Sequence, residues 1–157
     1  GNVDIVARRR SPGGGDDSDI TQVLHIRTTY RAVPGTTYVE PTMLNGFRPF
    51  DVLLGETDPA LVDFQMDLYW MIKAGGDPIA YFNSNPGRFT SVHVKDATAA
   101  PELAMRDVGA GAVDWKKIFA LRAKAGIKYF IVEHDAPTPD PFTSITASYG
   151  YLSKLTF

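Results

Sequence analysis

The sequence predicts an α/β fold in which parallel strands alternate with helices. Short runs rich in β-branched and aromatic residues, which are typical of strands, lie at residues 62–67, 89–95 and 128–133. Segments whose apolar residues recur at helical spacing follow each of the three runs. Because such strands are joined by crossovers of one hand, all three should run parallel and end at the same edge of a sheet.

Aspartate–proline pairs mark where helices are expected to begin. An aspartate at the N-cap accepts hydrogen bonds from the first backbone amides, and proline suits the first helical position. Residues 68–74 should form a helix directly after the first strand, and Asp114 should cap a later one. The pairs themselves stand at Asp58-Pro59, Asp77-Pro78 and Asp140-Pro141. The last helix should turn an apolar stripe to the core, made of Phe142, Ile145, Tyr149, Leu152 and Leu155.

Residues 1–37 differ in composition from the rest of the chain. They hold a basic run at residues 8–10, a glycine-rich joint and an acidic block at residues 16–19. We expect an irregular or atypical N-terminal segment here, with one strand near residues 20–30, because such charge blocks are normally solvated. The chain opens with Gly1 rather than Met, which is expected of a processed, tagged or partial chain.

The composition is that of one globular domain, and it excludes several classes of function. The chain has 157 residues, of which 44% are hydrophobic and 22% charged, enough for a sizeable core. A net charge of −2 argues against binding nucleic acid through a basic surface. The absence of cysteine excludes thiolate catalysis and thiolate metal ligands. No apolar run approaches the roughly 20 residues that span a bilayer, so no membrane partner is expected.

Ionisable side chains stand at the ends of the three predicted strands: Asp67, His93 and Glu133. Ligands of parallel sheets bind at this carboxyl edge. One imidazole and two carboxylates at such an edge indicate a metal centre with nitrogen and oxygen donors. The alternative for His93 is a structural strand histidine, and the alternative for the two carboxylates is capping of nearby backbone groups.

Three neighbouring features allow two interpretations each. Lys95 either orients a substrate oxygen or phosphate, or it pairs with Asp96. His134 should face away from Glu133, because side chains alternate along a strand, which gives it a supporting or a surface role. In the long loop after Asp96, the Gly-Ala-Gly run at residues 109–111 is a weak signal of phosphate binding, and a tight turn is the ordinary alternative.

The chain resembles the sugar phosphate isomerase/epimerase family in five motifs, which occur in the order MDLYW, DPIAYFNSNPGRF, SVHVKD, DVGAGAVDW and YFIVEHD. Members of this family are xylose isomerase-like TIM barrels. The resemblance covers about residues 38–157 and matches the C-terminal part of that barrel. It implies that residues 38–157 form a partial (β/α)₈ barrel, made of roughly the last three βα units.

The resemblance also implies a function. It is that of a metal-dependent sugar or sugar phosphate isomerase or epimerase, which transfers a proton through an enediolate. Asp67, His93 and Glu133 would then hold a divalent metal, which is Mn, Mg, Co or Zn. Glu133 would also be the catalytic base, and Lys95 a second catalytic residue. A cytoplasmic location and a homo-oligomer are further expectations.

Two departures from the family's pattern favour another interpretation. A complete (β/α)₈ barrel needs about 250 residues, whereas this chain has 157. The family's fifth strand carries a His-Asn-His run before an acidic residue; here Glu40 is the match to that residue, and the histidines are absent. The alternative function is therefore a catalytically inactive barrel fragment or a binding module of the same family.

Overall fold

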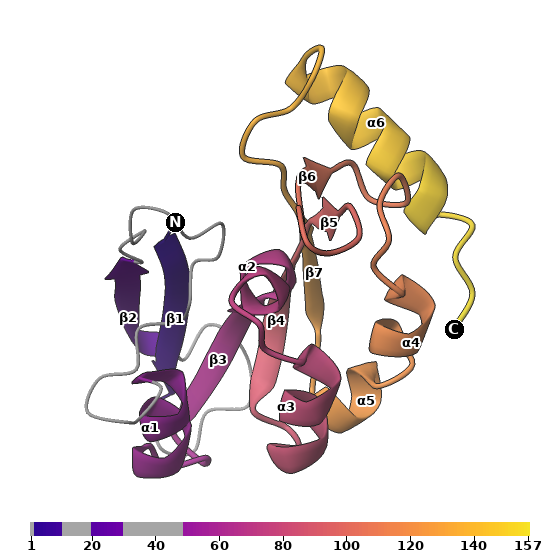
Figure 1. Ribbon diagram of the computed structural model, residues 1–157. Helices are drawn as coiled ribbons and strands as arrows, with labels where there is room; N and C mark the ends of the chain where they lie inside the picture. The colour runs from indigo at the N-terminus through magenta and orange to yellow at the C-terminus, as the bar shows by residue number, and fades with distance from the viewer. Residues whose placement is uncertain (1, 11–19, 30–48) are drawn as a thin grey trace.

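A computed structural model describes the backbone of residues 2–10, 20–29 and 49–157, and the side chains from Phe50 onward. Strands and helices alternate along most of this chain (Figure 1). The strands are β1 (Asn2–Arg10), β2 (Ile20–Thr29), β3 (Val62–Asp67), β4 (Phe89–Val94), β5 (Asp96–Ala97), β6 (Met105–Arg106) and β7 (Tyr129–Val132). The helices are α1 (Pro49–Glu56), α2 (Leu68–Lys73), α3 (Pro78–Ser84), α4 (Trp115–Phe119), α5 (Arg122–Ala125) and α6 (Pro141–Leu152).

The main sheet has five strands in the order β2-β1-β3-β4-β7. Strand β4 pairs in parallel with β3 on one side and with β7 on the other. This confirms the three predicted parallel strands and their βα connections. The register sets Asp67 of β3 beside His93 of β4, and His93 beside Ile131 of β7, so the three strands end at one edge of the sheet.

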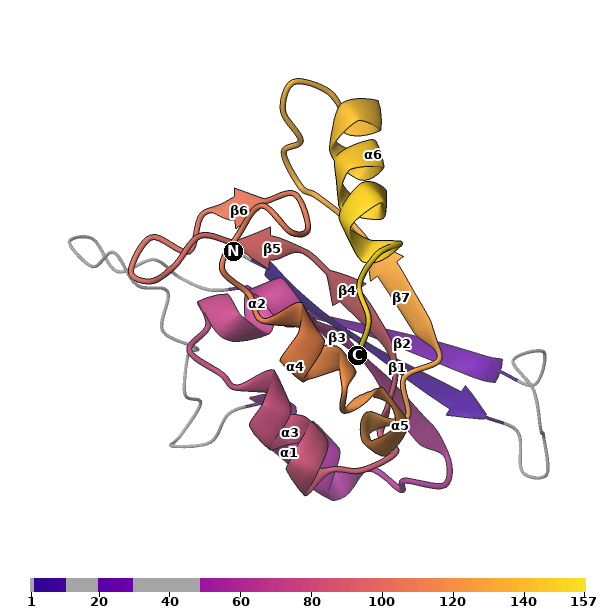
Figure 2. The same ribbon diagram turned by 90° about the vertical axis from the view of Figure 1, so that its right-hand side faces the viewer.

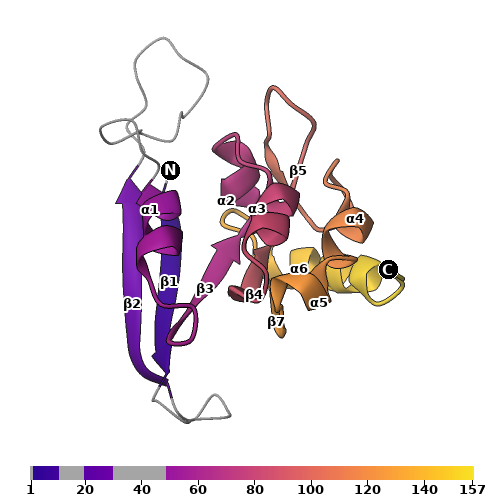
Figure 3. The same ribbon diagram turned by 90° about the horizontal axis from the view of Figure 1, so that it is seen from below.

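The described part of the N-terminal region, residues 2–10 and 20–29, forms two strands, one more than the sequence predicted. Strand β2 lies where one strand was expected, but β1 was not expected, and the two pair antiparallel. Strand β1 also pairs antiparallel with β3, so this hairpin extends the sheet on the side away from β7, as Figures 1 and 3 show. The β-branched residues Val3, Ile5 and Val6 favour a strand, and β3 offers it an edge to pair with. The predicted boundary at residue 37 and Glu40 lie outside the described residues.

The hydrophobic core lies between the sheet and the helices. Helices α1 to α5 cover the same face of the sheet (Figure 2), and each contributes to one buried cluster with Met66, Val92 and Val94 of the strands. Phe50 of α1 packs edge-on against Phe64, with ring centroids 5.7 Å apart. None of the helices in the described chain is long and apolar enough to cross a membrane. Because side chains alternate along a strand, His93, between Val92 and Val94 of β4, points to the other face of the sheet.

Two of the three aspartate–proline pairs begin helices as predicted. Asp77 caps α3 and Asp140 caps α6, each through its side chain. The prediction was wrong at Asp58, which begins a turn. Its Oδ1 accepts a hydrogen bond from Ala60 N at 2.9 Å, and its carbonyl accepts from Leu61 N and Val62 N. Strand β3 begins at Val62, so pairing within the sheet takes up the residues that a helix would have needed.

Helix α6 presents a different face from the predicted one. Phe142 and Tyr149 of the apolar stripe are 83% and 71% exposed, while Ser144 and Ser148 of the opposite face are buried. Ser144 Oγ donates a hydrogen bond to Asp107, and Ser148 Oγ accepts one from Val108 N at 3.0 Å. The helix is therefore held by polar contacts to the loop before α4. Of the stripe, Leu152 and Leu155 do pack against the core.

Candidate metal centre

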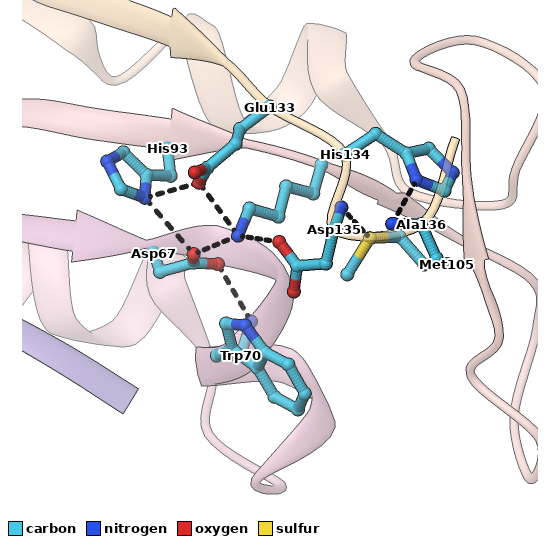
Figure 4. A network of polar contacts seen from close by, with 9 residues as sticks. Asp67, Trp70, His93, Met105, Glu133, His134, Asp135 and Ala136 are labelled. Atoms are coloured by element: carbon cyan, nitrogen blue, oxygen red, sulfur yellow. Dashed lines mark hydrogen bonds and ion pairs between the residues drawn. The ribbon is translucent and has the colours of Figure 1, made fainter. Parts of the chain in front are cut away.

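The three predicted ligands come together at the carboxyl edge of the sheet. Asp67 and His93 are partners in the β3–β4 register, and Glu133 follows β7 two residues after Ile131, the partner of His93. Residues two apart on a strand point to the same face, so this spacing carries Glu133 to the side where His93 lies. Figure 4 shows all three side chains turned toward one another.

The distances within this group are short. His93 Nδ1 lies 3.3 Å from Asp67 Oδ2 and 3.0 Å from Glu133 Oε2. One donor atom from each of the three residues lies within 4.8 Å of the others. The side chain of Asp67 is 4% exposed, that of His93 22% and that of Glu133 45%. The group therefore reaches from the protein interior to solvent, with Glu133 at its open end.

Asp67 is oriented by the helix that follows it. Its Oδ1 accepts a hydrogen bond from Trp70 N at 3.0 Å and so caps α2, which leaves Oδ2 to face His93. Burial raises the pKa of Asp67, but hydrogen bonds from His93 and Trp70 N and the charge of Lys95 outweigh it. The net pKa lies below the usual value, so Asp67 is a carboxylate at neutral pH.

Lys95 lies in the middle of the carboxylates. Its Nζ is 3.0 Å from Asp67 Oδ2, 2.8 Å from Glu133 Oε2 and 2.7 Å from Asp135 Oδ1. Burial lowers the pKa of Lys95, but hydrogen bonds to Asp135 and Glu133 and the charge of Asp67 raise it well above its ordinary value. The side chain is therefore an ammonium ion that neutralises part of the site's negative charge.

The alternative pairing of Lys95 with Asp96 does not occur, because Asp96 has other partners. Asp96 is 1% exposed and accepts four hydrogen bonds. Its Oδ1 accepts from Ala97 N at 2.8 Å and Val113 N at 3.1 Å, and its Oδ2 from Gly109 N and Trp115 Nε1, both at 2.8 Å. The carboxylate thus joins both ends of the loop at residues 97–113 to α4.

The four donors around the Asp96 carboxylate, which are the N–H groups of Ala97, Gly109 and Val113 and the Trp115 indole, form a cradle for it. The Gly-Ala-Gly run at residues 109–111 is part of this cradle. Gly109 donates its N–H to Asp96 with a φ of 92°, a conformation that favours glycine. A Cβ at Gly111 would collide with the Asp96 carboxylate and the Ala97 carbonyl. The glycines therefore let the backbone approach an internal anion. This is a physical reason to prefer a structural interpretation of the run over phosphate binding.

His134 and Asp135 complete the surroundings of the site. His134 turns away from Glu133, as Figure 4 shows; its Nδ1 accepts from Ala136 N at 3.2 Å, and its Nε2 lies 3.9 Å from Asp107. Asp135 was not singled out from the sequence, although it holds Lys95 more closely than any other carboxylate. Its position two residues after Glu133 was the available signal, since that spacing returns a side chain to the same face of a strand.

The residues present fit a divalent cation. One imidazole nitrogen and two carboxylates form a mixed nitrogen and oxygen donor set, which suits Mn²⁺, Mg²⁺, Co²⁺ and Zn²⁺. Two of these donors, Asp67 Oδ2 and Glu133 Oε2, already share a cation in this structure, the ammonium of Lys95. The arrangement therefore favours positive charge between the strand ends.

Comparison with known proteins supports the resemblance found in the sequence. No protein family model matches the chain, and no curated protein sequence matches it either. Among solved structures, a sugar phosphate isomerase/epimerase from Parabacteroides distasonis ATCC 8503 matches 70% of this chain with a TM-score of 0.57 and 28% identity. A second structure of that description from the same organism matches 68% of the chain, also with a TM-score of 0.57, at 27% identity.

This chain spans only 37% and 36% of the lengths of those two proteins. The predicted resemblance to sugar phosphate isomerase/epimerases is thus confirmed, and so is the fold class. The chain has the fold of part of an α/β barrel of that kind.

Proposed function

We propose that residues 38–157 carry part of a metal-dependent site that isomerises or epimerises a sugar or a sugar phosphate. The observation that carries this proposal is the convergence of Asp67, His93 and Glu133, whose donor atoms lie within 4.8 Å of one another at the carboxyl edge of a parallel sheet. The similarity to two sugar phosphate isomerase/epimerase structures supports the substrate class.

The chemistry follows from the charges around the site. A divalent metal, when bound, would supply positive charge that polarises the carbonyl and hydroxyl oxygens of the sugar. Glu133 is the proposed base that removes the proton from the adjacent carbon, because its carboxylate is the most exposed of the three. Lys95 is the second proposed catalytic residue. Its ammonium, 2.8 Å from Glu133, would stabilise the negative charge of the enediolate.

A second candidate function is an inactive barrel fragment or a sugar-binding module. The observation that favours it is the short span of this chain, 37% of the first similar structure. In addition, β7 pairs with β4 alone among the described strands, and its Tyr129 and Ile131 are exposed, whereas a closed barrel has no edge strands. Either function leaves the metal centre in place. A cytoplasmic location and a homo-oligomer stay predictions.

Proton exchange distinguishes the two functions. With Mn²⁺ and the purified chain in D₂O, we expect deuterium to enter ribulose or ribulose 5-phosphate beside the carbonyl. The rate should be well below the about 1–10³ s⁻¹ of ordinary enzymes, because little of a barrel encloses the sugar. Glu133→Gln should abolish the exchange, since an amide is no base and a positioned base contributes about 10²–10⁴ in rate. Loss of the C–H signal by ¹H NMR is the measurement.

Glu102→Gln is the matched control, because Glu102 is exposed and its side chain lies outside the site. Equal exchange by the wild-type chain and Glu133→Gln would contradict the role of Glu133 as base. No exchange in a chain that binds Mn²⁺ through His93 would favour the binding module over the enzyme.

A further inference from the structure

The Lys95 ammonium holds the same two oxygens that a metal would need. Asp67 Oδ2 lies 3.0 Å from Lys95 Nζ and 3.3 Å from His93 Nδ1. Glu133 Oε2 lies 2.8 Å from Lys95 Nζ and 3.0 Å from His93 Nδ1. A divalent ion bound to these oxygens would therefore lie close to the positive charge of Lys95. Because like charges so close repel strongly away from bulk water, Lys95 and the ion compete for the site.

Asp135 is a partner of Lys95 outside the group of candidate metal ligands. Its Oδ1 lies 2.7 Å from Lys95 Nζ, the shortest of the three contacts. Asp135 is not in the group of residues whose donor atoms all lie within 4.8 Å of one another. A lysine has a flexible four-carbon stem and a compact charge, so a small rotation can release Asp67 and keep Asp135.

We propose that Lys95 is a built-in counter-cation of this site, which holds Asp67 and Glu133 together without a metal and shifts onto Asp135 when a divalent ion binds. This inference rests on the proposed metal centre. It gives Asp135 the role of a positioning residue that never touches the ion. Held by Asp135, the ammonium leaves the oxygens that bind the ion but stays near the site, where the proposed reaction needs positive charge.

Lys95→Met should bind Mn²⁺ at least about tenfold more tightly than the wild-type chain, because it keeps the stem and removes the competing charge. Isothermal titration calorimetry with Mn²⁺ alone measures this. Lys73→Met is the matched control and should leave the affinity unchanged, since Lys73 donates to the carbonyls of Glu102 and Leu103 and not to the site. If Lys95→Met does not fold, Lys95→Gln removes the same charge and makes the same test.

Asp135→Asn separates a positioning residue from a ligand. In the wild-type chain it should weaken Mn²⁺ binding at least about fivefold, because Lys95 then stays on the metal's oxygens. In the Lys95→Met background the same change should cost less than about twofold. An equal loss in both backgrounds would make Asp135 a direct ligand and overturn its proposed role.

Mn²⁺ binding by His93→Ala and Lys95→Met separates the metal centre from the counter-cation role of Lys95. If His93→Ala binds Mn²⁺ as the wild-type chain does, the metal centre itself is wrong. If His93→Ala loses Mn²⁺ but Lys95→Met binds it no more tightly than the wild-type chain, the metal centre stands and the counter-cation proposal is wrong. Tighter binding by Lys95→Met together with the dependence on His93 supports both.

Discussion

Asp96→Ala should destabilise the folded chain by about 3–5 kcal/mol, the largest effect expected of any single change considered. The substitution leaves four donors without an acceptor: the buried Ala97 N–H and Trp115 indole N–H, and the partly buried N–H groups of Gly109 and Val113. Each buried donor left unpaired costs about 1–3 kcal/mol, and partial relaxation of the loop keeps the sum lower. Domains are stable by only about 5–15 kcal/mol, so urea unfolding should move to a much lower midpoint.

Asp96→Asn should destabilise the folded chain nearly as much as Asp96→Ala. This result would identify the charge and the geometry of the carboxylate as the source of its stabilising effect. Each oxygen of Asp96 accepts two hydrogen bonds, so an amide at either place sets an NH₂ group against two donors. Asp114→Ala is the matched control: Asp114 caps α4 through one hydrogen bond from Lys117 N at 3.0 Å, and such a cap is worth about 1 kcal/mol. Equal urea midpoints for Asp96→Ala and Asp114→Ala would contradict the cradle.

Asp67→Ala should have the second largest effect, about 2–4 kcal/mol without metal. It removes the N-cap of α2, worth about 1 kcal/mol. It also removes a buried carboxylate that His93 and Lys95 both contact, and a charged hydrogen bond is worth about 1.5–3 kcal/mol. Asp67→Asn should lose only the second part, because asparagine caps helices as well as aspartate does. Urea unfolding at pH 7 of both variants measures the two parts separately.

The pH dependence of this effect has a definite sign. The folded-state pKa of Asp67 is lowered, so its stabilising contribution is fully present above the unfolded pKa of about 3.9. It is lost as the pH falls through the lower folded value. The difference in stability between the wild-type chain and Asp67→Asn should therefore shrink below about pH 4. A difference that stays constant down to pH 2 would show that the charge of Asp67 contributes nothing.

The sequence predicted those features that depend on local patterns. Strands β3, β4 and β7 follow from short runs of strand-forming residues, and their parallel order follows from the helices between them. That order alone brings Asp67, His93 and Glu133 to one edge, so the candidate ligands could be found without coordinates. The aspartate caps at Asp77, Asp114 and Asp140 were likewise predictable, because capping involves neighbours in the chain.

Features that depend on distant partners were missed. Strand β1 exists through pairing with β3, more than fifty residues later in the chain, and no local pattern reveals that pairing. The exposed stripe of α6 reflects the contacts of Ser144 and Ser148 with the loop near Asp107. The sequence left open whether Lys95 contacts a substrate or pairs with Asp96. The burial of Asp96 among its four hydrogen-bond donors decides against that pair. The features that the sequence did not predict are therefore those that depend on contacts between residues far apart in the chain.

Titration of the wild-type chain and His93→Ala with Mn²⁺ tests the metal centre most directly. Calorimetry should give one ion per wild-type chain. His93→Ala should bind at least about a hundredfold more weakly, because even residues that only support metal ligands contribute about 10–100-fold. His93→Ala should still fold, although it loses the contacts of His93 Nδ1 with Asp67 and Glu133, because Lys95 keeps its contacts with both carboxylates. Mn²⁺ binding of the same strength in both chains, or none in the wild-type chain, would contradict a centre built from Asp67, His93 and Glu133.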